Sequence, residues 1–562
     1  MTVELSNSIS IFSILNNLAS FRPSRRAQNS ARKFEAMPIY RTQPEIHSPL
    51  WSLIMALAPA GPGLPLEEPS VLSLNQPRSV FVEKVLRLQP NVNKIYLLLR
   101  APDAKSATKR LHSEVIGTEL FRILRDKWGS KFDHFISTKV IAVPGDISSI
   151  NLGVNESKLR EEMFKEIDIV VNSAATTDFI ERYDVAMCIN TFGPFNVMSF
   201  AKRCDNIKLF LHISTAYVCG EGTRLILEKP FQMGETLKKT CNKLDINEEK
   251  RLMEEKSEEL ISQCASNEAI TSTMKELGLK RAKLYGWPNT YVFTKAMGEM
   301  ILGNFKGDLP LVIIRPTMIS STYKEPFPGW IEGVRTIDGA IVGYGKGKLT
   351  CFPGNPNSPL DVIPADMVVN AMVVAMVLHT NHHQTYDDDS GQKKTYDDDE
   401  ANIYHVSSSL RNPLQFSDLH NIVYNYFTKN PWINKRSGER IKVGKVTVLS
   451  TANRYFLYMN IKYVLPLKVL CLVNTLSWQY FREVYVDLNR KIKFAMGLAE
   501  LYKPYVFFKG IFDDTNLKKL RMAAKEEGID PSLFNFDSKT IDWEDYIMNV
   551  HVPGLSTHVI KS

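Results

Sequence analysis

The 562-residue sequence has few cysteines, and none of them forms a short-spaced pair. The seven cysteines are odd in number, and no two lie at the Cys-x-x-Cys spacing of structural zinc sites and redox motifs. Neither a disulfide framework nor a zinc site is therefore expected to organise this protein. A reducing compartment is the simpler expectation.

The sequence also lacks an uncharged apolar run as long as a membrane-spanning helix, which needs about 20 residues. The nearest approach is residues 455–478, which Lys462, Pro466 and Lys468 interrupt. We therefore expect a buried helix or a membrane-surface helix there, and peripheral membrane association rather than a span.

Neither sign of charge dominates, since 69 basic residues face 61 acidic ones and the net charge is +8. No stripe of Lys and Arg interleaved with aromatic residues occurs, so nucleic acid is not an expected partner. Half of the excess charge lies in residues 1–34, and residues 5–34 contain no acid. That composition resembles an organelle transit peptide, with a disordered tail as the alternative.

The length exceeds that of one ordinary domain and suggests two or three. Residues 1–70 are expected to form an N-terminal extension. Residues 71–450 are expected to form a Rossmann-type domain. From about residue 450 the pattern becomes helical and aromatic, which predicts a C-terminal helical domain over residues 451–562.

Short, almost wholly apolar runs alternate with helical stretches through the middle of the chain. Such runs suit parallel strands covered on both faces, and the alternation predicts an α/β fold with a Rossmann-like, doubly wound parallel sheet. Right-handed crossovers would place the carboxyl ends of the strands on one edge, where ligands bind. The predicted strands are residues 95–99, 140–143, 167–171, 209–213 and 311–314, and the predicted helices include residues 80–88, 105–127 and 190–203.

Two segments stand apart from this alternation. Residues 246–284 are rich in Glu and Lys at helical spacing, which predicts a solvated helical insert. Residues 380–402 contain Thr-Tyr-Asp-Asp-Asp twice, which indicates a tandem duplication in an exposed loop. The spacing and turn glycine of a calcium-binding EF-hand are missing there, so no metal site is expected.

The strongest local motif is Tyr291-Val-Phe-Thr-Lys295. Residues four apart lie on one face of a helix, and an ammonium beside a phenol lowers the pKa of the phenol. The tyrosine would protonate a carbonyl oxygen as hydride arrives at the carbon, and the lysine would also bind a cofactor ribose. Because this spacing is common by chance, an ordinary amphipathic helix is the alternative.

The predicted strand over residues 209–213 ends in two hydroxyl residues, Ser214 and Thr215. A hydroxyl at this position would hydrogen-bond the same carbonyl oxygen and stabilise its developing negative charge. The offset from the strand favours Thr215, with Ser214 second. A turn residue or a helix cap is the alternative for either.

Two strand ends fit a dinucleotide site. Asn172, Ala174 and Ala175 follow a buried strand, and small residues there let a cofactor lie close to the backbone. Asp146 and Ile147 follow the preceding strand and are expected to border an adenine ring.

Arg100 ends the strand that should carry the ribose selector. An acid at this position binds a ribose 2′-hydroxyl, whereas an arginine suits a 2′-phosphate. The residue therefore favours NADPH over NADH, with a surface salt bridge as the alternative.

Together these residues resemble the plant-type alcohol-forming fatty acyl-CoA reductases, which belong to the extended short-chain dehydrogenases. The similarity runs from about residue 80 to the C-terminus. It is carried by Asn-Ser-Ala-Ala-Thr-Thr-Asp-Phe at 172–179, Asn-Thr-Phe-Gly-Pro-Phe-Asn at 190–196, His-Ile-Ser-Thr-Ala-Tyr-Val at 212–218, the motif at 291–295, Ile-Ile-Arg-Pro-Thr at 313–317, Pro-Phe-Pro-Gly-Trp-Ile-Glu-Gly at 326–333, Asp-Val-Ile-Pro-Ala-Asp at 361–366, and the tail at 541–554.

The resemblance implies a reaction. A fatty acyl thioester takes hydride from NADPH and loses CoA to give an aldehyde, and a second NADPH reduces the aldehyde to a primary alcohol. Tyr291 would donate the proton, Lys295 would tune its pKa and bind the ribose, and Thr215 or Ser214 would contact the oxyanion.

The resemblance also implies supporting roles. Asn190 matches a helix position that helps to hold the lysine, and Pro316 falls among the cofactor-binding residues. The C-terminal domain and residues 325–360 would shape the acyl site. The family is mostly associated with the endoplasmic reticulum, whereas the N-terminal composition here favours a plastid.

One departure from the family pattern concerns the phosphate loop. The family places a strand and Thr-Gly-x-x-Gly-Phe just before the helix at residue 80, and the two glycine positions fall here on Leu72 and Asn75. Glycines let the backbone approach a pyrophosphate at the helix N-terminus. Residues 53–58 are a poor first strand, because they are followed by a Pro-rich stretch and lie far from the helix. A wrong first exon, an impaired paralogue or a different phosphate-binding loop would each explain this.

Two competing functions follow. Another extended short-chain dehydrogenase, such as a hydroxysteroid or flavanonol reductase, is opposed by the helical C-terminal domain. A non-catalytic relative that binds acyl-CoA or a partner is favoured by the altered phosphate loop. The retained Tyr291 and Lys295 oppose that second alternative.

Overall fold

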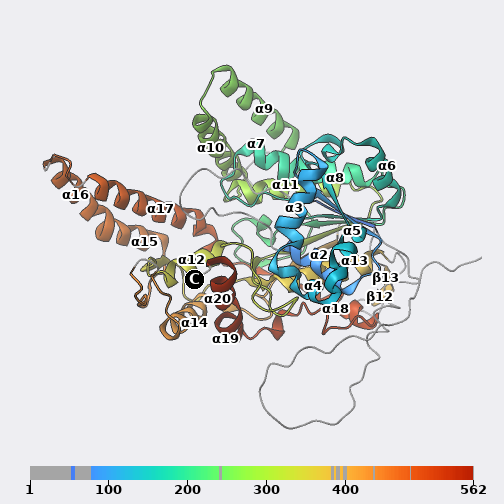
Figure 1. Ribbon diagram of the computed structural model, residues 1–562. Helices are drawn as coiled ribbons and strands as arrows, with labels where there is room; N and C mark the ends of the chain where they lie inside the picture. Colours follow the sequence, from blue (N-terminus) through green and yellow to red (C-terminus); the bar gives the residue numbers. More distant parts are fainter. Residues whose placement is uncertain are drawn as a thin grey trace, which may run out of the picture.

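The computed structural model describes residues 52–56, 77–238, 243–380, 385–387, 393–395, 402–434, 437–476, 478–480 and 482–560. Its centre is a parallel sheet that lies between layers of helices (Figure 1). The sheet has seven strands in the order β14-β7-β5-β4-β1-β2-β3. The strands are β1 (Ser52–Ala56), β2 (Lys94–Leu99), β3 (Val140–Pro144), β4 (Ile169–Asn172), β5 (Leu209–Ile213), β7 (Leu311–Pro316) and β14 (Asn402–Val406).

The doubly wound α/β class predicted from the sequence is confirmed. The chain order of the strands reverses between β1 and β4, and the two halves of the sheet run outward from that pair. β5 coincides with its predicted range, and the other predicted strands agree within two residues at each end. The carboxyl ends of all seven strands therefore meet at one edge, where a doubly wound sheet binds its ligand.

The expectation that residues 53–58 make a poor first strand is wrong. β1 occupies the centre of the sheet, with Leu53 in register with Ile95 of β2 and Ile169 of β4. This strand also falls inside the segment 1–70 that was expected to be an extension. A long connection to the next helix is tolerated, because the entropy of loop closure grows only slowly with loop length. The positions of the two family glycines, Leu72 and Asn75, lie outside the described residues.

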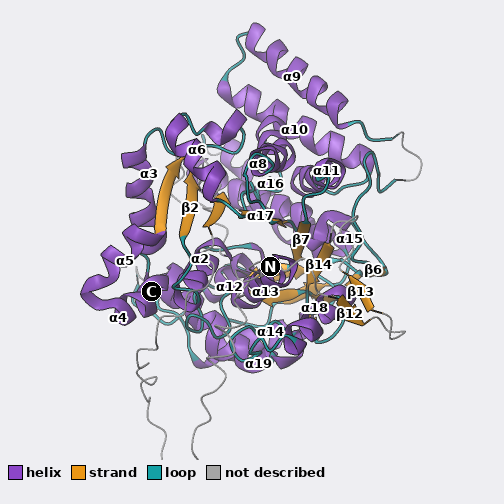
Figure 2. Ribbon diagram, turned by 90° about the vertical axis from the view of Figure 1, so that its right-hand side faces the viewer, coloured by secondary structure: helices purple, strands orange, loops and turns teal. Residues whose placement is uncertain are grey.

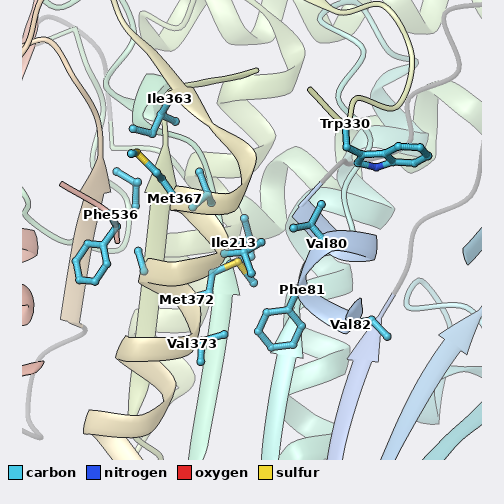
Figure 3. Packing of buried hydrophobic residues seen from close by; sticks show 14 of the residues in the cluster. Val80, Phe81, Val82, Ile213, Trp330, Ile363, Met367, Met372, Val373 and Phe536 are labelled. Atoms are coloured by element: carbon cyan, nitrogen blue, oxygen red, sulfur yellow. The ribbon is translucent and has the colours of Figure 1, made fainter. Parts of the chain in front are cut away.

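One face of the sheet is covered by α2 (Pro77–Leu88), α13 (Ala365–Thr380) and α18 (Thr515–Glu526). All residues of α13 are buried, as expected for a helix that is apolar on every side. Val80, Phe81, Met372 and Val373 belong to one apolar cluster between the helices and the sheet (Figure 3). This packing holds the first turn of α2 beside the edge of the sheet.

The opposite face carries α6 (Ser157–Glu166), η5 (Met187–Phe192), α8 (Gly193–Ala201) and α11 (Thr290–Phe305). Gly298 lets α11 lie directly against η5, because a Cβ at this position would overlap the carbonyl oxygen of Asn190. The close approach fixes α11, which carries the Tyr-x-x-x-Lys motif, to the sheet.

The helical insert is confirmed as the pair α9 (Ile246–Ser262) and α10 (Asn267–Tyr285), which extends beyond the body of the molecule (Figure 2). The single helix predicted over residues 105–127 is broken into α3 (Ala104–Arg110), η1 (Leu111–Ile116), η2 (Glu119–Phe121) and α4 (Arg122–Trp128). In the duplicated segment, β12 (Thr385–Asp387) pairs with β13 (Lys393–Thr395), and residues 381–384, 388–392 and 396–401 lie outside the described residues.

The C-terminal part contains a protruding helical arm. α15 (Ala452–Met459), η7 (Asn460–Val464) and α16 (Leu465–Leu476) lead outward, and α17 (Arg482–Val506) packs against α16 (Figure 1). The prediction of a buried helix here is wrong, because most of residues 452–476 are solvent-exposed. In the described part of the chain, this stretch is the one helix that is long and apolar enough to cross a membrane, by length and composition alone.

The remaining C-terminal residues pack back onto the Rossmann-type core. β17 (Ile511–Phe512) pairs with β6 (Leu225–Ile226), and α18 contacts α13. α19 (Trp543–Asp545), η9 (Tyr546–His551), α20 (Val552–Gly554) and η10 (Leu555–Ile560) complete the chain. Their apolar residues join the same cluster as α2 and α13.

Candidate active site

The Tyr-x-x-x-Lys motif lies in the first two turns of α11. Asn289 caps the helix, since its side-chain oxygen accepts the N–H of Val292 at 3.1 Å. Tyr291 and Lys295 are one turn apart and share a face of the helix. Because α11 is fixed to the sheet, both side chains are held near the carboxyl ends of the strands.

The structure brings Thr215 and Tyr291 together. Thr215 follows β5 and caps the short helix η6 (Ala216–Cys219), and its hydroxyl lies within hydrogen-bonding reach of the Tyr291 phenol. The neighbouring Ser214 has a buried hydroxyl oxygen without a hydrogen-bond partner in the described part of the chain. A buried hydroxyl without a partner fits a site that awaits a ligand oxygen.

The expected lowering of the Tyr291 pKa by Lys295 is wrong for the protein alone. Burial raises the pKa of Tyr291 to about 12, and the influences that lower it are the Thr215 hydrogen bond and the charge of Arg335. The ammonium of Lys295 is engaged elsewhere. Its Nζ donates to the carbonyl oxygen of Ile213 at 2.8 Å and lies 3.1 Å from Nε2 of His212.

His212 links the lysine to the cofactor-side residues. Its Nδ1 lies 3.2 Å from Nδ2 of Asn172, at the end of β4. Burial, followed by the charge of Lys295, holds the pKa of His212 well below its usual value, so the ring is neutral. Burial also lowers the pKa of Lys295 to about 8, against a raising influence of Glu299. His212 was not predicted, although it is the one polar residue in the apolar strand 209–213 and could have been noticed there.

The predicted cofactor residues Arg100 and Asp146 form an ion pair, with 3.0 Å between Nε and Oδ2. Arg100 is 52% exposed, so the pair lies at the surface of the sheet edge, as the salt-bridge alternative expected. Asp146 also accepts the N–H of Ser148 at 2.9 Å. Ile147 is buried, and its carbonyl oxygen accepts the side-chain N–H of Asn196 at 2.9 Å.

Asn190 ties the end of β4 to the catalytic helix. Its Nδ2 donates to the carbonyl oxygen of Thr176 and to Oγ1 of Thr294, both at 3.1 Å, and its Oδ1 accepts the N–H of Thr176 at 3.0 Å. Ala174 and Ala175 lie buried between these anchors. Pro316 ends β7 at the same edge of the sheet, in register with Val406.

These residues fit a nicotinamide dinucleotide. Small, buried residues follow β4 at the point where the strand order reverses, and the free Ser214 hydroxyl lies one strand away. In the described ranges, no group of three or more His, Cys, Asp or Glu is placed to hold a metal ion.

Comparisons with known proteins agree with this geometry. An NAD-binding family model described as "Male sterility protein" matches residues 79–372, and a second model of the same description matches residues 462–562. The alcohol-forming fatty acyl-CoA reductase of Simmondsia chinensis is 52% identical over 482 residues, which cover 86% of this chain and 94% of that protein. The chain belongs to the fatty acyl-CoA reductase family. The family predicted from the sequence is thereby confirmed, together with the nicotinamide cofactor in its general form.

Two Arabidopsis thaliana proteins extend the comparison of this reductase. Fatty acyl-CoA reductase 1 is 54% identical over 485 residues, covering 86% of this chain and 95% of that protein. Fatty acyl-CoA reductase 2, chloroplastic, is 40% identical over 488 residues, covering 86% of this chain and 76% of that protein. Among solved structures, the terminal R domain of the myxalamid pathway is similar. The match covers 91% of this chain and 92% of that domain, with a TM-score of 0.49 and 14% sequence identity. The assignment rests on the sequence relatives.

Aromatic side chains lie next to Tyr291 of the reductase. Phe179 stacks on Tyr291, with 6.1 Å between the ring centroids, and on Tyr505 at 4.9 Å. Tyr502 contacts Phe179 edge-on. Tyr505 also accepts a hydrogen bond from the side-chain nitrogen of Asn289 at 2.7 Å. The carboxyl end of α17 therefore lies against the catalytic helix, which the sequence did not predict.

Proposed function

We propose that this protein reduces long-chain fatty acyl-CoA to a primary alcohol through an aldehyde, using NADPH and Tyr291 as the proton donor. The observation that carries the proposal is the contact between Thr215 and the Tyr291 phenol, with Lys295 one turn further along α11. The relatives named as fatty acyl-CoA reductases support the substrate class. The impaired-paralogue alternative has no support among the described site residues.

The reaction balances with two hydride transfers. A nicotinamide cofactor, when bound, would supply each hydride to the carbonyl carbon. In the first round the carbon–sulfur bond breaks, and CoA leaves as a thiol after taking a proton. In the second round the aldehyde oxygen takes a proton and becomes the alcohol hydroxyl. One thioester, two NADPH and two protons thus give one alcohol, one CoA and two NADP⁺.

The residues of the chain handle the carbonyl oxygen. A tyrosine whose pKa burial raises to about 12 stays protonated at neutral pH, as a proton donor must. Thr215 or Ser214 hydrogen-bonds the same oxygen as negative charge develops on it. Lys295, whose Nζ donates to the carbonyl oxygen of Ile213, would hydrogen-bond a ribose of the cofactor.

The cofactor-binding residues are proposed as a set along the sheet edge. Arg100 would pair with the 2′-phosphate that distinguishes NADPH from NADH, since a guanidinium offers more than one donor and its Nε already holds Asp146. The remaining proposed residues are Asp146, Ile147, Asn172, Ala174, Ala175, Asn190, Lys295 and Pro316.

The acyl chain is proposed to pass the aromatic residues beside Tyr291. Phe179, Tyr502 and Tyr505 present apolar rings next to the phenol and come from the Rossmann-type domain and from α17. Under this proposal the reacting carbonyl would lie between the Rossmann-type part, whose sheet includes β1, and the C-terminal part over residues 451–562.

The helical arm is proposed to bind a membrane surface. Residues 452–476 contain three basic residues and no acid, which complements an anionic bilayer face. α17 carries Glu483, Asp487 and Arg490, so this half of the arm cannot lie in hydrocarbon and the arm rests in the interface. The exposed apolar side chains along the outward half and the tip include Leu457, Ile461, Leu465, Leu472, Leu476 and Trp478.

The endoplasmic reticulum and the plastid both offer such a membrane face. The arm fits either one. The N-terminal composition favours the plastid, and one relative is named as chloroplastic.

The test is the conversion of palmitoyl-CoA by the purified full-length protein, with fatty alcohol and NADPH oxidation measured together. Tyr291→Phe should abolish alcohol formation while NADPH still binds. The matched control is Tyr463→Phe, which removes a phenol that hydrogen-bonds Thr350 at the surface and should leave turnover unchanged. If Tyr291→Phe produces as much alcohol as the wild type, Tyr291 is not the proton donor and the proposed mechanism is wrong.

A further inference from the structure

Arg335 has two guanidinium nitrogens, Nε and Nη2, that are buried and lack a hydrogen-bond partner within the ranges that the structure describes. The residue itself is well anchored. It caps α12 (Thr336–Gly345), and its backbone N–H donates to Oδ2 of Asp338 at 3.1 Å. Leaving a buried donor unpaired costs free energy, so native structures hold few of them. The two open donors therefore point to a ligand.

The segment that carries Arg335 packs on the first turn of α2. Trp330 lies beside Val80 in the apolar cluster (Figure 3), and Glu332 accepts a hydrogen bond from the hydroxyl of Ser79. Arg78, buried in the same turn, is close enough for the charge of Arg335 to lower its pKa, although burial is the larger cause.

The charge of Arg335 also reaches the phenol of Tyr291. Arg335 is thus within electrostatic range of both the first turn of α2 and the proton donor. The guanidinium comes from neither the Tyr-x-x-x-Lys helix nor the strand ends.

Two carboxylates lie near Arg335, and each is in contact with another group. Oδ2 of Asp338 accepts the backbone N–H of Arg335, and its Oδ1 lies 3.1 Å from Nε2 of His551 without a hydrogen bond. Glu332 accepts the indole N–H of Trp330 at 3.4 Å. Neither carboxylate forms a hydrogen bond with the two open nitrogens of Arg335. An anionic ligand would therefore meet oriented donors that the surrounding side chains leave available.

We propose that Arg335 binds a phosphate group of the nicotinamide dinucleotide. In a doubly wound sheet the pyrophosphate lies at the N-terminus of the helix after the first strand, which here is α2. That helix begins Pro77-Arg78-Ser79 and has no glycine in its first turn. The guanidinium fork matches phosphate oxygens and reaches the site from the segment after β8 (Met318–Ser320).

This assignment rests on the proposed function, and binding measurements separate the two. The purified full-length wild type, Arg335→Gln and Arg335→Lys are titrated with NADPH by calorimetry, and separately with CoA, which also carries phosphates. Arg335→Gln should bind NADPH about 10- to 100-fold more weakly, the usual effect of losing a charge-assisted hydrogen bond. Arg335→Lys, which keeps the charge but not the fork, should fall in between. Affinity for CoA should be unchanged in both.

The control is Arg251→Gln, which removes a 62% exposed arginine from the insert helix α9 and should bind NADPH like the wild type. Thermal unfolding of each variant checks the fold, and Arg335→Lys tests the inference if Arg335→Gln does not fold. Equal NADPH affinity in the wild type and the Arg335 variants overturns the inference and leaves the proposed function standing. A loss confined to CoA also overturns it. A wild type that binds no NADPH overturns the proposed function as well.

Discussion

The side-chain nitrogen of Asn289 donates a hydrogen bond to the phenolic oxygen of Tyr505 across 2.7 Å. Asn289 caps the catalytic helix α11, and Tyr505 lies near the carboxyl end of α17, the inner half of the helical arm. One bond thus joins the helix that carries the proposed proton donor, Tyr291, to the arm that is proposed to bind a membrane. An acyl substrate drawn from that surface would reach Tyr291 along the same arm.

The first prediction concerns the tip of the arm. Replacing Leu472, Leu476 and Trp478 together by serine should lower binding to vesicles containing phosphatidylserine by at least about 10-fold, because each exposed side chain loses the gain from apolar burial. Flotation of the purified protein with such vesicles measures this. Trp478 is 96% exposed, so the fold should tolerate the change.

The matched control replaces Ile150 and Ile261, which are exposed apolar residues outside the arm. Ile150→Ser and Ile261→Ser should float like the wild type. A triple variant of the tip that floats equally well would exclude the arm as the membrane-binding element.

The second prediction concerns cofactor choice. Arg100→Glu should weaken NADPH binding by about 10- to 100-fold, because a charge-assisted contact to the 2′-phosphate is lost and a like charge is introduced. Binding of NADH should change far less. Titrations of the two dinucleotides followed by fluorescence give the ratio, with Arg251→Glu as the exposed control. If the ratio of NADPH affinity to NADH affinity does not change, Arg100 has no role in cofactor choice and forms only the surface ion pair with Asp146.

The third prediction is a pH dependence set by Lys295. Burial lowers its pKa to about 8 in the folded protein, so the ammonium that is proposed to bind the ribose is lost as pH rises through that value. The kcat/KM for NADPH, which reports the free enzyme, should therefore fall above about pH 8. The stability contribution has the opposite sign. The unfolded chain holds the proton up to the ordinary lysine pKa of 10.5, so stability rises between about pH 8 and 10.5.

Glu299 provides the check on that assignment. Its carboxylate raises the pKa of Lys295 and forms a buried ion pair with Arg315 at 2.5 Å. Glu299→Gln should therefore move the falling limb of kcat/KM to lower pH, and should also destabilise the fold by about 3–5 kcal/mol, since one partner of a buried pair is removed. If the fall of kcat/KM with rising pH occurs at the same pH in Glu299→Gln, that fall reports a group other than Lys295.

The fourth prediction concerns the seam between the last helices and the segment after β8. A Cβ on Gly554 would overlap the carbonyl oxygen of Gly329, so Gly554→Ala should lower the free energy of unfolding by about 1–3 kcal/mol. The control is Gly497→Ala, inside α17, where an added Cβ meets nothing within 4 Å. That variant should be stabilised by about 0.5–1 kcal/mol. Urea unfolding of the two variants should separate them, and equal stabilities would contradict the close packing.

The sequence by itself determined the class of the fold and the chemistry of its best motif. Short apolar runs such as 209–213 could be predicted as strands, because their residues can be buried on both faces of a parallel sheet. Tyr291 and Lys295 share a helix face through spacing alone. The hydroxyl of Thr215 at the end of β5 followed from its offset from a recognisable strand. Each of these depends on residues close together in the chain.

The tertiary structure alone decided which groups meet. It placed β1 at the centre of the sheet, held Lys295 on His212 rather than on the Tyr291 phenol, and brought Arg335 to the first turn of α2. It also paired Arg100 with Asp146 across neighbouring strands. Strand order, burial and the resulting pKa values depend on contacts between residues far apart in the chain. Local pattern and propensity carry no information about those distances, so these features appeared only when the sheet and its covering helices were assembled.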